Sequence, residues 1–310
     1  MTPSNWPARV EVVEVGPRDG LQNEPEDVAT ADKAAFVNLL SAAGLPVIEV
    51  AAFVNPKRVP RMADAAQVFA AVDRREGVRY AALVPNLRGL EAALAAGVRE
   101  VAIFAAASET FSRRNINQGI DDSLATYALV CREALTAGAR VRGYLSTVFG
   151  CPYEGNVPAG RVASLAARLR DLGVFQVALS DTIGVAHPAQ VWSVLDAVTP
   201  GVPVAHLALH FHDTRGTALA NVLAALDRGV GTFDASAGGL GGCPFAPGAS
   251  GNLATEDLVY LLDGLGIETG ISLGALLAAS RFIESRLDHP LPSRVYQAER
   301  RKTRVKDSGQ

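Results

Sequence analysis

Residues 161–179 read RVASLAARLRDLGVFQVAL, and this stretch shows the pattern that decides the fold. Apolar residues recur at helical spacing from Arg161 to Leu172. Gly173 follows at the point where a helix C-terminus needs a left-handed cap. The apolar run from Phe175 to Leu179 then has the length of a buried strand. The stretch therefore predicts a helix, a tight turn and a strand in direct succession.

The same unit recurs along the chain. The predicted strands are the short apolar runs Val10–Val15, Val47–Val50, Tyr80–Val84, Val101–Phe104, Val141–Val148, Phe175–Leu179, Leu207–Phe211 and Thr232–Ala235. Helical spacing fills most of the gaps between them, over Thr30–Ala43, Leu87–Ala96, Leu124–Ala137, Arg161–Leu172, Pro188–Val198 and Thr217–Arg228. Most of these helices are followed by a glycine, namely Gly44, Gly97, Gly138, Gly173 and Gly229. Strands that alternate with helices predict a parallel sheet.

Eight such units in roughly 250 residues, with no linker between them, favour a closed (β/α)8 TIM barrel over an open doubly wound sheet. We expect one catalytic domain over residues 1–310, with the barrel at about 10–236. A glycine-rich lid loop and a C-terminal capping region occupy about 237–287, with helices at Thr255–Leu262 and Leu273–Arg286 that cap or flank the barrel. The basic residues within 300–310 predict a solvated tail.

Charge and composition exclude several classes of protein. The 310 residues carry 29 Lys and Arg against 32 Asp and Glu, so there is no basic surplus for nucleic-acid binding. Glycine, proline or charge interrupts each apolar stretch before the roughly 20 residues of a membrane span, so no membrane association is expected. The first residues resemble neither a secretory signal nor a transit peptide, which predicts the cytoplasm. The cysteines, Cys131, Cys151 and Cys243, are odd in number and far apart, which predicts free thiols.

Polar residues at strand ends carry the chemistry of this fold, because the active site of such a barrel lies at the C-terminal ends of its strands. The segment GPRDGLQNE, residues 16–24, follows the first predicted strand and places Arg18 beside Asp19. An adjacent cation and carboxylate is often only a surface ion pair. Its position at the barrel mouth favours a functional site.

A histidine pair ends the seventh predicted strand. Alternate residues of a strand share a face, so His210 and His212 point the same way while Phe211 points oppositely. A single histidine near a strand end is usually only a hydrogen-bonded polar residue, but two on one face favour metal coordination. His187, His206 and His289 have no such pairing and are expected to be structural.

A glycine-rich segment, GGLGGCPFAPGASGN, covers residues 238–252 and contains Cys243. It can be a flexible loop with an incidental cysteine, but its glycine density predicts a mobile lid that places Cys243 over the site on closing. Glu49 lies near the end of the second predicted strand, and Asp181 lies at the end of the sixth. Either carboxylate could hold Arg18, orient a ligand or accept a proton, and the sequence leaves these alternatives open.

Asp19, His210, His212 and Asn252 together offer two oxygens and two nitrogens. Oxygen and imidazole donors without thiolate suit Mg2+ or Mn2+ in six-coordinate geometry better than structural zinc. Coordination positions then remain open for a chelating substrate. The sequence therefore predicts a divalent metal site at the barrel mouth.

The same segments, with several others, resemble the 3-hydroxy-3-methylglutaryl-CoA lyase family from about Val10 to Leu287. The further matching segments are Phe53, Pro56-Lys57, Val59-Pro60, Ser108-Glu109, Asn115-Ile116-Asn117, Arg142-Gly143-Tyr144, residues 150–155 (GCPYEG), residues 180–184 (SDTIG) and residues 251–257 (GNLATED). Their order and spacing make the resemblance specific, above all in the loop around Cys243.

The resemblance implies a metal-dependent lyase that cleaves an acyl-CoA substrate, 3-hydroxy-3-methylglutaryl-CoA, to acetyl-CoA and acetoacetate, in leucine degradation and ketone body metabolism. It implies that Asp19, His210, His212 and Asn252 bind the cation, that Arg18 contacts the acyl carbonyl and that Cys243 is catalytic. We add Gln22 as a substrate-binding residue, and Asp181 and Glu49 as catalytic residues. The base stays open between Asp19, Asp181 and His210. A homo-oligomer is expected, because symmetric assemblies are common.

The chain departs from the family pattern at a few positions. Ala52 and Ala178 stand where the family commonly has serine, Gln176 where it has glutamate and Ser180 where it has glycine. A pocket without those hydroxyls is less polar, and polar recognition carries large specificity factors. The same cleavage on a 3-hydroxyacyl-CoA with a longer or more apolar C3 branch is therefore the alternative.

Other classes of protein share parts of this pattern. Isopropylmalate and homocitrate synthases share the Arg-Asp start and the histidine pair, but they condense acetyl-CoA with a 2-oxo acid. Metal-dependent amidohydrolases place their His-x-His pair on the first strand, whereas this chain places it on the seventh. A catalytically silent binding protein that retains the fold would take up no divalent metal.

Overall fold

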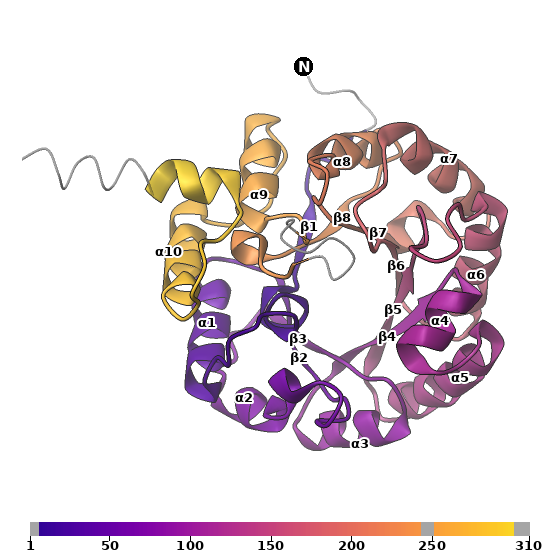
Figure 1. Cartoon of the computed structure of the whole chain (residues 1–310), viewed down its shortest axis with the longest axis horizontal. Coiled ribbons are helices and arrows are strands. Elements are labelled where there is room, and N and C mark those ends of the chain that lie inside the picture. Colours follow the sequence, from indigo (N-terminus) through magenta and orange to yellow (C-terminus); the bar gives the residue numbers. More distant parts are fainter. Residues whose placement is uncertain (1–5, 243–250, 301–310) are drawn as a thin grey trace, which may run out of the picture.

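The computed structural model describes residues 6–242 and 251–300. Its parallel strands pair in sequence order, and β8 pairs with β1 to close a barrel (Figure 1). The strands are β1 Glu11–Glu14, β2 Val47–Ala52, β3 Arg79–Leu83, β4 Glu100–Ala106, β5 Arg140–Ser146, β6 Gln176–Asp181, β7 Leu207–Phe211 and β8 Thr232–Ala235. The predicted TIM barrel is confirmed, with every strand within a few residues of its predicted range.

Helices surround the barrel on its outside (Figure 1). They are α1 Thr30–Ala42, α2 Ala65–Ala71, α3 Leu87–Ala95, α4 Glu109–Ile116, α5 Ile120–Thr136, α6 Ala159–Asp171, α7 Pro188–Val198, α8 Ala218–Leu226, α9 Thr255–Gly264 and α10 Leu273–Glu284. None of the helices in the described ranges combines the length and apolarity that a bilayer span requires.

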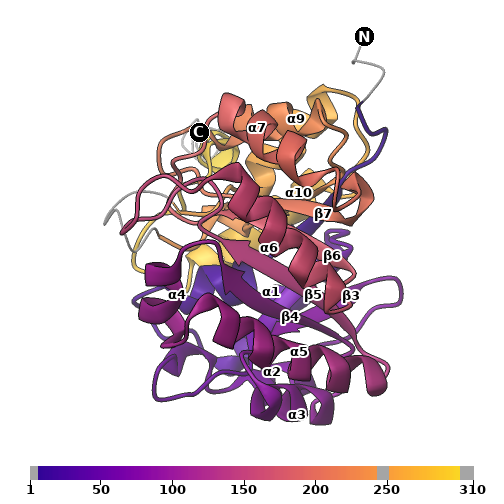
Figure 2. The same ribbon diagram turned by 90° about the vertical axis from the view of Figure 1, so that its right-hand side faces the viewer.

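The sequence pattern did not predict α2 and α4. Helix α2 has seven residues, too few to show a clear period of 3.6 residues. Helix α4 is mostly polar, and it buries only Phe111 and Ser112, so it lacks an apolar stripe. In the side view, α4 lies toward the end of the barrel where the strands finish, next to the start of the outer helix α5 (Figure 2). Helix α4 is therefore an insertion at the barrel mouth rather than part of the outer ring.

The glycines predicted to cap helices have left-handed backbones. Their φ angles range from 74° at Gly138 to 94° at Gly44, with Gly97, Gly173 and Gly229 between these values. A side chain with a Cβ atom meets steric strain in this region, whereas glycine does not. The glycine pattern therefore identified the helix C-termini correctly.

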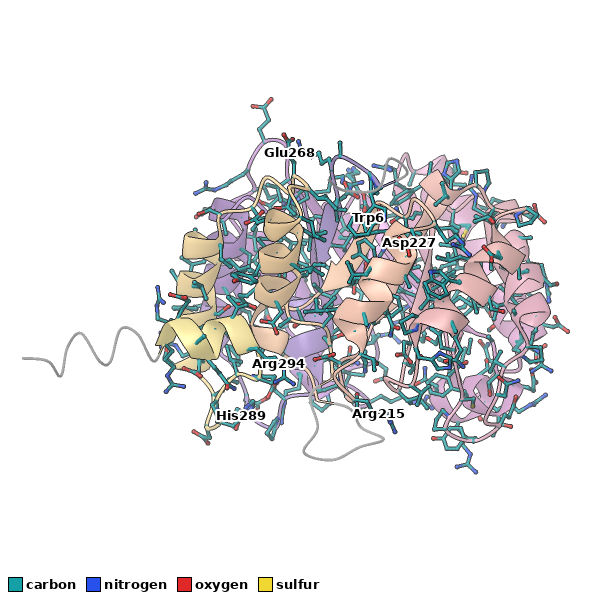
Figure 3. All side chains as sticks on the ribbon, turned by 90° about the horizontal axis from the view of Figure 1, so that it is seen from above. Trp6, Arg215, Asp227, Glu268, His289 and Arg294 are labelled. Carbon is teal, nitrogen blue, oxygen red and sulfur yellow. The ribbon has the colours of Figure 1, made fainter. Side chains whose placement is uncertain are left out.

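The helices after β8 flank the barrel. Helix α9 packs against α8, and α10 packs against α1, so together they fill the outer ring between α8 and α1 (Figure 1). Glu268, in the turn between them, bonds to the chain before β1 and marks the amino ends of the strands. Arg215, His289 and Arg294 lie toward the opposite end, where the strands finish (Figure 3). The C-terminal segment therefore reaches the catalytic face.

Two helix-capping glycines give a matched test of backbone packing. A Cβ atom on Gly44 would lie 2.5 Å from the Gly270 carbonyl oxygen, whereas one on Gly138 would meet nothing within 4 Å. We expect Gly138→Ala to lower the free energy of unfolding by about 1–2 kcal/mol, the strain of a left-handed alanine. Gly44→Ala should lower it further, because the turn before α10 must also move. Urea denaturation measures both, and equal losses would contradict the close contact.

Candidate active site

A cavity of about 830 Å³ opens at the carboxyl ends of the strands. Arg18, Asp19 and Gln22 contribute to its wall from the segment after β1, and His210 and His212 contribute from the end of β7. These residues are among the predicted site residues. The structure therefore brings together groups that lie nearly 200 positions apart in the sequence.

The loop after β1 positions Arg18 and Asp19. Residues Gly16–Gly20 form a single π-helical turn, and Arg18 is buried within it. The Arg18 guanidinium donates through Nη1 to Asp19 Oδ1 at 2.5 Å and through Nε to Glu49 Oε1. Of the two carboxylates that could hold Arg18, the structure selects Glu49.

The histidine pair faces Asp19. His210 Nε2 lies 4.0 Å from Asp19 Oδ2, and the two imidazole centroids are 5.3 Å apart. Ligand atoms of Asp19, His210 and His212 all lie within 4.8 Å of one another. Asn252 is joined to His212 by a backbone bridge, and its Nδ2 donates to Asp19 Oδ2 at 3.0 Å. The four predicted metal ligands therefore lie in one cluster.

Two buried polar atoms of the cluster lack hydrogen-bond partners, which also favours a bound divalent cation. Asn252 Oδ1 and His212 Nδ1 are buried and have no hydrogen-bond partner within the described ranges. An unsatisfied buried polar atom costs about 1–3 kcal/mol, so such atoms need a compensating partner. Asn252 Nδ2 donates to Asp19 and to the Leu240 carbonyl, so to bind a cation the amide must give up these hydrogen bonds and turn Oδ1 toward Asp19. A carboxylate, an amide oxygen and two imidazoles then form a donor set that suits Mg2+ or Mn2+.

The surroundings of Asp19 and His212 favour the protonation states in which these two side chains bind a metal. Burial opposes ionisation of Asp19, but Arg18, His210, His212 and the hydrogen bond from Asn252 together outweigh it and lower the Asp19 pKa to about 2. Burial and the neighbouring His210 lower the pKa of His212 to about 3. Near neutral pH, Asp19 is therefore a carboxylate and His212 is a neutral imidazole, which are the forms that bind a cation.

A hydrogen-bonded network lies beneath the cluster. Tyr144 donates to Glu49 Oε2 at 3.1 Å and accepts from Arg142, which pairs with Asp234 on β8. The sequence pattern indicated no role for Arg142, Tyr144 or Asp234. A charged residue inside the apolar run Thr232–Ala235 was the available signal for Asp234, because buried carboxylates require a partner.

The remaining predicted residues have different positions. Gln22 lines the cavity, consistent with contact to a ligand. Asp181 lies outside the described cavity wall, and its two oxygens accept the backbone N–H groups of Val185 and Ala186 at 3.0 Å. These bonds shape the loop after β6, and a catalytic role for Asp181 stays a prediction. Cys243, with most of the predicted lid, lies outside the described residues.

Comparison with known proteins extends these observations. A family model described as HMGL-like matches residues 9–283. The 3-hydroxy-3-isohexenylglutaryl-CoA/hydroxy-methylglutaryl-CoA lyase of Pseudomonas aeruginosa is 54% identical over 279 residues, which are 90% of this chain and 93% of that protein. The hydroxymethylglutaryl-CoA lyase YngG of Bacillus subtilis is 52% identical over 292 residues, 94% of this chain and 98% of that protein. The crystal structure of hydroxymethylglutaryl-CoA lyase from Pseudomonas aeruginosa superposes with a TM-score of 0.95 at 52% identity and covers 96% of this chain and 99% of that one.

A buried carboxylate behind the site gives a pH-dependent prediction. Burial raises the pKa of Glu14 from its usual value of 4.5 to about 7, although Thr255, Ala237 and Gly16 donate hydrogen bonds to it. Between these two pH values the folded state binds more protons than the unfolded state, so the free energy of unfolding falls as pH rises. The fall is about 3 kcal/mol at most for one such carboxyl.

Glu14→Gln should flatten this pH dependence between pH 5 and 7.5, because an amide does not titrate. Glu256, whose pKa burial also raises to about 7, remains in the variant and keeps part of the slope. Urea denaturation of metal-free protein at several pH values measures the effect. An unchanged slope in Glu14→Gln would show that Glu14 is already ionised in the folded protein at low pH.

Proposed function

The chain belongs to the HMGL-like family, and from this premise we propose that it cleaves 3-hydroxy-3-methylglutaryl-CoA to acetyl-CoA and acetoacetate. The observation that supports this reaction most directly is the cluster of Arg18, Asp19, His210 and His212 in one cavity. Cleavage of the C2–C3 bond removes the proton of the C3 hydroxyl and leaves an enolate of the thioester. The site must therefore favour loss of that proton and stabilise negative charge on the carbonyl oxygen.

Asp19, His210, His212 and Asn252 would hold the divalent cation, which when bound lowers the pKa of the substrate C3 hydroxyl and orients it. Asp19 is ionised and accepts a hydrogen bond from the Arg18 guanidinium at 2.5 Å, which holds its carboxylate in place. Of the three candidate bases for the hydroxyl proton, Asp19 and His210 line the cavity, whereas Asp181 does not.

Arg18 meets the charge that develops on the acyl carbonyl. Glu49 and Asp19 hold its guanidinium at the cavity wall before any substrate arrives. A charged donor fixed in advance stabilises a developing oxyanion without reorganisation, and removing one such donor typically lowers kcat by about 10²–10³-fold. The same two carboxylates keep Arg18 protonated, because they raise the pKa of a guanidinium whose burial alone would lower it.

Cys243 is the proposed acid that delivers a proton to C2 of the enolate and so completes acetyl-CoA. This assignment rests on the chemistry of the residue and on the family resemblance, because Cys243 lies outside the described residues. A thiol with an ordinary pKa of about 8.5 remains largely protonated at neutral pH and can act as an acid there.

A second candidate substrate carries a longer C3 branch. The Pseudomonas aeruginosa relative that is 54% identical is named for both 3-hydroxy-3-isohexenylglutaryl-CoA and hydroxymethylglutaryl-CoA. Apolar side chains line part of the cavity here, namely Val54, Val59, Leu83, Phe104, Phe111 and Ile116. Ala52 and Ala178, which prompted this alternative, are fully buried and lie outside the described wall. The apolar cavity wall, rather than the two alanines, therefore supports a substrate with an apolar C3 branch.

Three finer parts of the proposal rest on general grounds. The donor set favours Mg2+ or Mn2+ as the cation. A homo-oligomer is proposed because symmetric assemblies are common among soluble enzymes. The cytoplasm is proposed as the location because Cys131 and Cys151 are free thiols, which is usual in a reducing compartment.

An assay on a panel of thioesters tests the function. Purified protein with Mn2+ should release acetyl-CoA from 3-hydroxy-3-methylglutaryl-CoA, and from the isohexenyl analogue if the apolar wall accepts the branch. Chelation with EDTA should abolish the release, and added Mn2+ should restore it, because the cation is required for proton loss. Release of acetyl-CoA from no 3-hydroxyacyl-CoA in the panel would refute the proposed cleavage.

Replacing Cys243 distinguishes a lyase that cleaves the acyl-CoA from a synthase that condenses acetyl-CoA with a 2-oxo acid. Cys243→Ala should lower the rate of acetyl-CoA release by about 10²-fold or more, the usual contribution of a positioned acid. Cys131→Ala is the matched control, because Cys131 is a free buried thiol on the outer helix α5. A synthase that condenses acetyl-CoA with a 2-oxo acid should tolerate both changes. Full lyase activity in Cys243→Ala would remove Cys243 from the mechanism.

A further inference from the structure

A buried ion pair lies in the barrel interior below the cavity. Arg142 on β5 and Asp234 on β8 are only 3% and 1% exposed. Arg142 donates through Nη2 to Asp234 Oδ1 at 2.7 Å and through Nη1 to Asp234 Oδ2 at 3.1 Å. A bidentate arginine–carboxylate pair fixes the carboxylate plane as well as its position. Asp234 is therefore held in one orientation.

The other donors of Arg142 are also occupied. Its Nε donates to Gln176 Oε1 at 2.9 Å, and Nη1 also donates to Tyr144 Oη at 2.9 Å. A planar guanidinium with partners on several sides cannot turn without breaking charge-assisted hydrogen bonds in a dry interior. The position of Arg142, and through it that of Asp234, is thus set by β5, β6 and β8 together.

Asp234 also contacts His210. His210 Nδ1 lies 3.2 Å from Asp234 Oδ2. Both oxygens of Asp234 accept hydrogen bonds from the Arg142 guanidinium, so the group pairs with this cation as a carboxylate. An ionised carboxylate only accepts hydrogen bonds, so His210 donates through Nδ1. The other nitrogen, Nε2, faces Asp19 across 4.0 Å, and in the neutral imidazole, the form that binds a metal, it carries the lone pair.

The second histidine of the pair lacks such a contact. His212 Nδ1 is buried without a partner among the residues that the structure describes. The two imidazoles therefore differ, because His210 is oriented before an ion arrives and His212 is not.

We propose that Asp234 is a positioning residue that fixes the ring and tautomer of His210 for metal binding, and that Arg142 holds Asp234 for this purpose. The inference rests on the metal site of the proposed function. Carboxylates that accept from the distal N–H of a ligating histidine orient the ring, and their loss typically weakens metal affinity about 10–100-fold. Neither residue touches the cavity, so both act through His210.

The test compares the Mn2+ affinity of three variants with that of the wild-type chain. Each protein is prepared metal-free, its fold is checked by circular dichroism, and Mn2+ is titrated in calorimetry and in EPR, which counts free ion. Asp234→Asn should bind Mn2+ about 10–100-fold more weakly than wild type. Arg142→Lys should weaken binding by a smaller factor, because an ammonium cannot hold both oxygens of Asp234 in a fork.

Tyr144→Phe is the matched control. It removes hydrogen bonds to Arg142 and Glu49 from the same network but leaves the Asp234–His210 contact intact. Its Mn2+ affinity should equal that of wild type within error, whereas a general loosening of the barrel interior would weaken all three variants alike.

The outcomes separate this inference from the function on which it rests. If wild type binds Mn2+ and folded Asp234→Asn binds it equally well, the positioning role is wrong while the metal site stands. If wild type binds no Mn2+, both are wrong. Should Asp234→Asn fail to fold, Arg142→Lys decides the matter, and an affinity equal to wild type in that variant would overturn the proposal.

Discussion

Two guanidinium groups are buried inside the barrel, and the need to pair their charges organises the site. Arg18 lies between Asp19 and Glu49, and Arg142 lies against Asp234. A charge in a low-dielectric interior is very costly unless a counter-charge and hydrogen bonds compensate it. Removing Asp234 would leave Arg142 without its counter-charge, whereas removing Asp19 or Glu49 would leave Arg18 with one carboxylate instead of two. The positions of Asp19 and Asp234, which flank His210, are therefore consequences of charge pairing.

Closure of the barrel brings these paired charges next to the histidine pair. Strand β8 lies between β1 and β7, so the loop that carries Asp19, the carboxylate of Asp234 and the imidazole of His210 become neighbours. Asn252 joins them because the chain after β8 returns along the end of β7, where it bridges His212. Neighbours in the barrel that are far apart in sequence thus share one mouth, as the fold requires.

The cavity has two chemically different sides. The groups suited to cation binding and charge stabilisation come from β1, β7 and the chain after β8, whereas much of the apolar wall comes from β3, β4 and the inserted helix α4. These sides belong to different segments, so changes in the apolar wall can alter which acyl branch fits without disturbing the charged cluster.

The sequence by itself determined the alternation of strands and helices, the glycine caps and the candidate residues Arg18, Asp19, His210 and His212. These features follow from local periodicity, backbone sterics and residue chemistry, all of which can be read within a few positions. Only the tertiary structure decided that Glu49 rather than Asp181 holds Arg18, that α4 enters the mouth, and that Arg142 and Asp234 lie beneath His210. Such pairings depend on which inward-facing side chains meet across a closed barrel. Residues that meet in this way lie far apart along the chain, so local sequence patterns do not reveal their contact.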